Sequence, residues 1–103
     1  MTGKNSFPGT FLPVKLTDTA IALDSEFSAS YLGRGGVYFT MGRYDEALRD
    51  LNRSLDLNPS LKDAYITRGN LYTKLAELTN DINIKNEYLR KARDDFEKMY
   101  CLR

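Results

Sequence analysis

The side chains that most often carry out chemistry are scarce in this chain. It contains no histidine, so the commonest general base and metal ligand is missing. Its single cysteine, Cys101, has no base partner that the sequence identifies, and no phosphate-binding loop or nucleophile elbow occurs. The carboxylate pairs Asp45-Glu46 and Asp94-Asp95 fall on the surfaces of predicted helices. We therefore expect no catalytic residue, no metal site and no cofactor, and we do not expect an enzyme.

Two arginines recur in one pattern and are the remaining candidates for a chemical role. The pattern Tyr-x-x-Arg-Gly-x-x-Tyr occupies residues 31–38 and again residues 65–72. Arg34 and Arg68 could each bind an anion. Alternatively, each arginine lays its stem over the aromatic rings and sends its head to solvent or to a carbonyl at a helix end. We favour this structural interpretation.

The elements that position these residues repeat with the same spacing. The two octapeptides lie 34 residues apart, which is the length of one helix-turn-helix unit in a stacked array. Such arrays bind other proteins and rarely carry out chemistry. The repeat therefore indicates the fold and favours protein binding over catalysis.

Composition excludes several other classes of protein. The 103 residues include 15 basic and 14 acidic ones, which leaves a net charge of +1. This balance gives no field that would attract nucleic acid or an anionic membrane. No apolar run approaches the roughly 18 residues of a membrane helix, and residues 1–14 show no signal peptide. We expect an intracellular, cytoplasmic protein.

Four helices are predicted after residue 25. The first runs to about Met41, with Ser25 or Ser28 as its cap and Gly42 as its stop signal. The second runs from about Tyr44 to Leu57, because its apolar residues recur with helical spacing, and Asn58-Pro59 ends it.

The third helix should begin in Ser60-Leu61-Lys62-Asp63, which resembles a capping box, and end between Leu75 and Leu78. The fourth, about Asn86 to Cys101, repeats the second at an offset of 45 residues, so eleven residues are inserted near 79–85. This insertion could form a longer loop. We favour extended helices joined by a short loop near Asn80-Asp81.

Small residues inside these helices predict close packing. Gly35 and Gly69 lie in the middle of helices, where a glycine costs about 1 kcal/mol relative to alanine. That cost is tolerable where a bulky group from a neighbouring helix must lie against the backbone. Ala47 and Ala92 are expected to serve the facing helices in the same way.

These residues resemble the tetratricopeptide repeat, a 34-residue antiparallel helix pair. The signature positions of the first unit are matched by Tyr31, Gly35, Tyr38, Gly42, Tyr44, Ala47, Leu51 and Pro59. Those of the second unit are matched by Tyr65, Gly69, Tyr72, Ala92 and Phe96. The resemblance implies an all-α fold in which helix-turn-helix repeats stack as a short right-handed α-solenoid. We expect an irregular segment over 1–19 and a repeat domain over 20–103, with units at about 28–61 and 62–103.

The resemblance also implies a binding groove lined by the first helix of each unit. The residues expected there are Leu32, Gly36, Phe39, Asp63, Ile66, Asn70, Thr73 and Lys74. The alternative is that the N-terminal segment, with Phe7, Phe11, Leu12 and Val14, covers them. One subclass of the family binds acidic chaperone tails through Lys, Asn and Arg. Only Asn70 matches that clamp, because Leu32 and Gly36 occupy its first-unit positions.

The function expected from these features is binding of a partner's peptide or helix in the groove. A different possibility is self-association, because the last helix has no cap. Its residues Leu89, Phe96, Met99 and Tyr100 would leave an apolar flank on which a second copy could dock. The chain could also be a fragment of a longer array that acts as an assembly scaffold.

Overall fold

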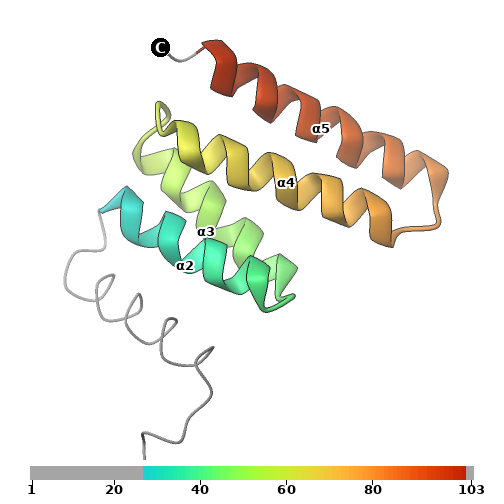
Figure 1. Ribbon diagram of the computed structural model, residues 1–103, viewed down its shortest axis with the longest axis horizontal. Helices are drawn as coiled ribbons and strands as arrows, with labels where there is room; N and C mark the ends of the chain where they lie inside the picture. The colour runs from blue at the N-terminus through green and yellow to red at the C-terminus, as the bar shows by residue number, and fades with distance from the viewer. Residues whose placement is uncertain (1–26, 102–103) are drawn as a thin grey trace, which may run out of the picture.

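A computed structural model describes residues 27–101, which form four helices and no strand within that range. They are α2 (Ser28–Thr40), α3 (Tyr44–Leu57), α4 (Lys62–Leu78) and α5 (Ile82–Cys101). Each helix packs antiparallel to the next, and α2 also touches α4 (Figure 1). The described part is therefore all-α, as predicted. The irregular segment expected over 1–19, its possible covering of the groove, and the first residues (20–26) of the expected repeat domain lie outside the described residues.

The turn between α2 and α3 is set by Gly42. Its φ of 82° is in the left-handed region, the only positive φ among the described residues. The Gly42 N–H donates to the Phe39 carbonyl (3.0 Å) and the Arg43 N–H donates to the Tyr38 carbonyl (2.9 Å). These two hydrogen bonds form a Schellman motif, which ends α2 where the sequence predicted. The predicted cap at Ser28 is wrong, because Phe27 holds the cap position and no side chain caps the helix.

The turn between α3 and α4 is built around Asn58 and Pro59. Asn58 Oδ1 accepts the Ser60 N–H at 3.1 Å, and the Tyr65 hydroxyl donates to the Pro59 carbonyl at 2.9 Å. The predicted bounds of α3 are confirmed. The capping box predicted at Ser60 is wrong, since Leu61 holds the cap position and offers no hydrogen-bonding side chain.

The eleven inserted residues lengthen α4 and α5 rather than forming a long loop. Residues 79–81 alone connect them, which confirms the predicted short loop. Asp81 Oδ1 accepts the N–H groups of Asn83 (2.9 Å) and Ile84 (3.3 Å) and so caps α5. Because of this cap, α5 begins at Ile82, four residues before the predicted start at Asn86.

The core lies where α2, α3 and α4 meet. One cluster of buried residues contains Ala47, Leu51 and Leu71. A second contains Leu55, Ala64 and Tyr65, and the half-buried Leu32 packs against both clusters. This shared contact joins the two helix pairs into one body.

Two mid-helix glycines lie against bulky side chains, as predicted. A Cβ built on Gly35 would lie 3.0 Å from Leu51 Cγ, and one built on Gly69 would lie 2.7 Å from the Phe96 ring. Ala47 and Ala92 are buried as expected. Phe96 therefore points inward to α4, and the prediction that it belongs to an uncovered flank is wrong. Met99 also faces inward, against the second core cluster.

Candidate functional site

The predicted groove residues of α2 lie in different environments. Leu32 and Phe39 are half-buried and pack against the core, where the Phe39 ring meets Tyr44 edge-on at 5.9 Å. Gly36 is different, because a Cβ built there would meet nothing within 4 Å. Among the predicted groove residues of α2, Gly36 thus faces open space. Leu32 and Phe39 bury part of their surface in the core.

The predicted groove residues of α4 include one partly accessible apolar side chain outside the core. Ile66 is half-buried and belongs to neither core cluster, while Asp63 and Asn70 are exposed. Because residues of a helix advance by about 100° each, Asp63, Ile66 and Asn70 fall within one arc of α4.

The remaining two predicted residues of α4 are partly engaged within the helix. Thr73 Oγ1 donates to the Gly69 carbonyl at 2.9 Å. Lys74 Nζ lies 3.8 Å from Glu77 Oε1 in an ion pair open to solvent. A surface pair of this kind contributes little to stability, so Lys74 remains available to a ligand.

Arg34 and Arg68 are structural, and their heads are held by buried carboxylates, although the two side chains stay 22% and 21% exposed. Arg34 Nε donates to Asp50 Oδ2 (2.7 Å) and its Nη2 donates to Oδ1 (2.8 Å). Arg68 forms the same two-pronged bond with Asp95, at 2.9 Å and 2.7 Å. Both aspartates are buried. The prediction thus missed the main partner of each guanidinium, which is an aspartate of the next helix.

Each arginine contacts the tyrosine rings as predicted, but it does so with its guanidinium rather than with its stem. The Arg34 guanidinium lies 5.9 Å from the Tyr31 ring centre and 5.8 Å from that of Tyr38. Arg68 repeats this arrangement with the two tyrosines of α4, at 5.8 Å and 6.0 Å. In each unit, one arginine thus contacts two tyrosine rings of its own helix and binds one aspartate of the following helix.

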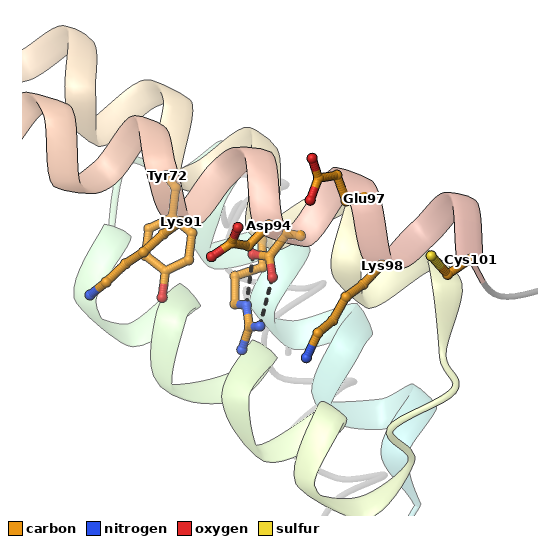
Figure 2. A pocket seen from close by; sticks show the side chains of 8 residues that line it. Tyr72, Lys91, Asp94, Glu97, Lys98 and Cys101 are labelled. Carbon is orange, nitrogen blue, oxygen red and sulfur yellow. Dashed lines mark hydrogen bonds and ion pairs between the residues drawn. The ribbon is translucent and has the colours of Figure 1, made fainter.

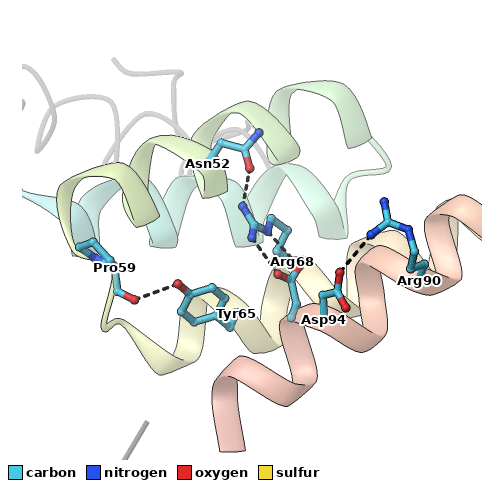
Figure 3. A network of polar contacts seen from close by, with 7 residues as sticks. Asn52, Pro59, Tyr65, Arg68, Arg90 and Asp94 are labelled. Carbon is cyan, nitrogen blue, oxygen red and sulfur yellow. Dashed lines mark hydrogen bonds and ion pairs between the residues drawn. The ribbon is translucent and has the colours of Figure 1, made fainter. Parts of the chain in front are cut away.

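Arg68 also connects the two units. Its Nη1 donates to Asn52 Oδ1 of α3 at 2.8 Å, so one guanidinium bridges α3, α4 and α5 (Figure 3). Burial opposes the charged form, yet the hydrogen bond and the negative charge of Asp95 raise the pKa of Arg68. The bridge therefore stays charged at any physiological pH.

Asp50 and Asp95 are the residues that sequence reasoning missed. Asp95 was expected on the helix surface with Asp94, but it is 3% exposed, whereas Asp94 is exposed. The sequence did contain a signal for these two aspartates, namely their spacing from the arginines. The arginine and aspartate are 16 residues apart in the first unit and 27 in the second, so the eleven-residue insertion accounts for the difference.

No arrangement for catalysis appears among residues 27–101. The described part of the chain has no group of three or more metal-binding side chains, and Cys101 is an exposed free thiol. None of the described helices is long and apolar enough to cross a membrane.

The first helix pair matches a known family. Residues 28–61 fit the family model of the tetratricopeptide repeat. Among solved structures, the second TPR of Spaghetti (RPAP3), bound to HSP90 peptide SRMEEVD, superposes with a TM-score of 0.72 at 24% identity. The superposition covers 87% of this chain and 73% of that one. It shows that the two chains share a helical-repeat fold.

Curated relatives are larger proteins. Hsp70-Hsp90 organizing protein 1 of Arabidopsis thaliana is 32% identical over 81 residues, which is 72% of this chain and 14% of that protein. The protein SGT1 homolog of Oryza sativa subsp. japonica is 30% identical over 66 residues, which is 64% of this chain and 18% of that protein. The chain thus spans only a small part of each relative. The chain thus carries a tetratricopeptide repeat at residues 28–61 and is a protein-interaction module of that repeat type.

Proposed function

We propose that the chain binds a peptide or helix of a partner protein on the shared side of α2 and α4. The observation that carries this proposal is Ile66, an isoleucine that belongs to neither core cluster although it sits in the middle of a packed helix. Asn70 lies one turn away and is exposed. A half-exposed apolar side chain beside free polar groups is typical of a surface that recognises a peptide.

The chemistry of this surface favours a ligand with an apolar anchor. Leu32 and Ile66 hold the same position in the two units, 34 residues apart, and both are aliphatic. Gly36 leaves open space at the position that Asn70 fills in the second unit. The solved relative holds an HSP90 peptide, which supports a peptide as the class of ligand. In this chain, Leu32 and Gly36 supply no charge for an acidic tail, so we propose an apolar side chain as the anchor.

Replacing Ile66 tests this surface. We expect Ile66→Glu to abolish capture of the chain's partners from a lysate, because a carboxylate would be buried against the apolar anchor without a partner. Capture is measured by quantitative mass spectrometry of the bound proteins, with the helical circular dichroism checked in parallel. Leu32→Glu is less informative, since Leu32 also packs against both core clusters and its loss would weaken the fold.

The matched control is Ile82→Glu. Ile82 is 62% exposed at the start of α5, so the same substitution there changes the net charge equally without touching α2 or the Ile66 arc. If Ile66→Glu and Ile82→Glu give the same partner profile as the unchanged chain, the proposed groove is not the site.

We also propose that the protein is located inside the cell, in the cytoplasm.

Self-association is a second candidate function, favoured by the outer face of α5. Tyr100 holds the position that Leu55 holds in the first unit, 45 residues earlier. Leu55 is 7% exposed because α4 covers it, whereas Tyr100 is 71% exposed and Leu89 is also exposed. A second copy could supply the helix that covers this face.

Light scattering after size-exclusion chromatography tests the second candidate. We expect the chain to form a dimer as its concentration rises, because docking would bury Leu89 and Tyr100. The variant Leu89→Glu/Tyr100→Glu should remain monomeric, since two carboxylates on the contact face repel each other. A strict monomer over a wide concentration range would exclude self-association and leave the groove proposal intact.

A further inference from the structure

An open pocket of about 460 Å³ lies on the side of α4 opposite to the proposed groove. Arg68 and Tyr72 of α4 and a row of charged α5 residues line it (Figure 2). Residues two apart on a helix point about 200° apart, so Arg68 faces away from Ile66, and Tyr72 faces away from Asn70. The pocket is therefore separate from the surface proposed above.

Two of the three carboxylates that line the pocket already have cationic partners. Asp95 is bound by Arg68 through two hydrogen bonds, and Asp94 Oδ2 accepts a hydrogen bond from Arg90 at 3.2 Å. Glu97 also lines the pocket, with its side chain directed to the other side of α5 from the lysines in Figure 2. The two pairings neutralise Asp94 and Asp95.

Two ammonium groups form no ion pair within 4.0 Å among the described residues, although the charge of Lys91 also acts on Glu87 one turn away. Lys91 Nζ lies 5.6 Å from the centre of the Tyr72 ring, and Lys98 Nζ lies 5.9 Å from that of Tyr65. Both lysines line the pocket and point to the same side of α5 (Figure 2). They are seven residues apart, so their backbones are separated by about 10 Å along the helix.

The Tyr72 hydroxyl is the third group available to a ligand. Tyr72 is 8% exposed, yet its hydroxyl makes no hydrogen bond within residues 27–101. Figure 2 shows it directed to the same side as the Lys91 ammonium. Burial raises the pKa of Tyr72, so the hydroxyl keeps its proton and can donate it in a hydrogen bond. The hydroxyl lies on the open pocket, where a ligand oxygen can accept its hydrogen bond.

We propose that this pocket binds an acidic segment of a partner protein, with one carboxylate held by Lys91 and the Tyr72 hydroxyl and a second held by Lys98. The spacing of the lysines fits two carboxylates about 10 Å apart on one face, which a segment in the polyproline II conformation provides at positions three residues apart. This site goes beyond the groove and can be occupied at the same time.

A peptide titration tests the site. The probe is acetyl-Gly-Asp-Gly-Gly-Asp-Gly-amide, followed by chemical-shift changes in the nuclear magnetic resonance spectrum of the complete chain. We expect saturable shifts around Lys91, Lys98 and Tyr72. Lys91→Gln/Lys98→Gln should weaken binding roughly five- to tenfold, because two charge-assisted contacts in an open site are lost. Tyr72→Phe should weaken it about threefold through loss of one hydrogen bond.

Three matched controls accompany the titration. Lys91→Arg/Lys98→Arg keeps both charges and should retain binding. Ile66→Glu should leave it unchanged, which separates this site from the groove. The Asn version of the peptide should not bind. Equal binding of the Asp and Asn peptides, or shifts unaffected by Lys91→Gln/Lys98→Gln, would overturn the proposal, whatever the outcome for the groove.

Discussion

Asp95→Leu is expected to lower the free energy of unfolding by about 3 kcal/mol. The substitution leaves the Arg68 guanidinium partly buried without its carboxylate, and breaking one partner of a buried pair costs about this much. Asp95 is 3% exposed and accepts both bonds from Arg68, which also reaches Asn52. The loss should therefore loosen α5 from α4 and weaken the junction between the two units. Urea unfolding followed by circular dichroism measures it.

Two further variants make this expectation specific. Asp94→Asn removes the neighbouring carboxylate, whose pair with Arg90 is exposed, and should barely move the urea midpoint. Arg68→Met/Asp95→Leu replaces the whole pair with apolar groups and should recover most of the lost stability. If the double variant is no more stable than Asp95→Leu, the cost does not come from an unpaired arginine.

The ends of a helix were predictable where the backbone conformation of a single residue stops the helix. Gly42 adopts a conformation that other residues avoid, and Pro59 restricts the residue before it, so both ends of α3 followed from the sequence. The cap on α5 was harder to find. Asp81 lies in a polar stretch where several residues could cap a helix, and only the structure shows which one does.

The arginine–aspartate pairs could not be predicted from periodicity alone. Asp50 and Asp95 sit on α3 and α5 among other acidic residues, and hydrophobic pattern favours an exposed position for any of them. Their burial is decided by a partner that lies on a different helix. The repeated pairing of arginine and aspartate was present in the sequence, but it becomes visible only after the insertion has been placed.

The sequence predicted which positions could line the groove, but not how exposed each side chain is. The repeat register places Leu32 and Ile66 at equivalent sites, yet their environments differ because the first unit has a following unit and the second has none in the described chain. Leu32 lies beneath that neighbour and joins both core clusters, while Ile66 does not. Equivalent residues of a short array can therefore differ in how much of their surface packs against the core.

Gly69→Ala should destabilise the fold by about 2 kcal/mol, although alanine is the better helix former. The added Cβ would lie 2.7 Å from the Phe96 ring, closer than atoms can approach, so α4 and α5 must separate or the ring must turn. Overpacking of this kind costs about 1–3 kcal/mol and outweighs the gain in helix propensity. Thermal and urea unfolding measure the change.

Gly36→Ala is the control, because it is expected to change the stability of the fold in the opposite direction. Gly36 is also a mid-helix glycine at the helical surface, but a Cβ there meets nothing within 4 Å, so alanine should stabilise the fold by about 0.5–1 kcal/mol. Gly69→Ala/Phe96→Leu tests the cause, because the smaller side chain makes room for the methyl group. The double variant should lose less than the sum of the two single changes. Strict additivity would show that Phe96 is not the reason for the glycine.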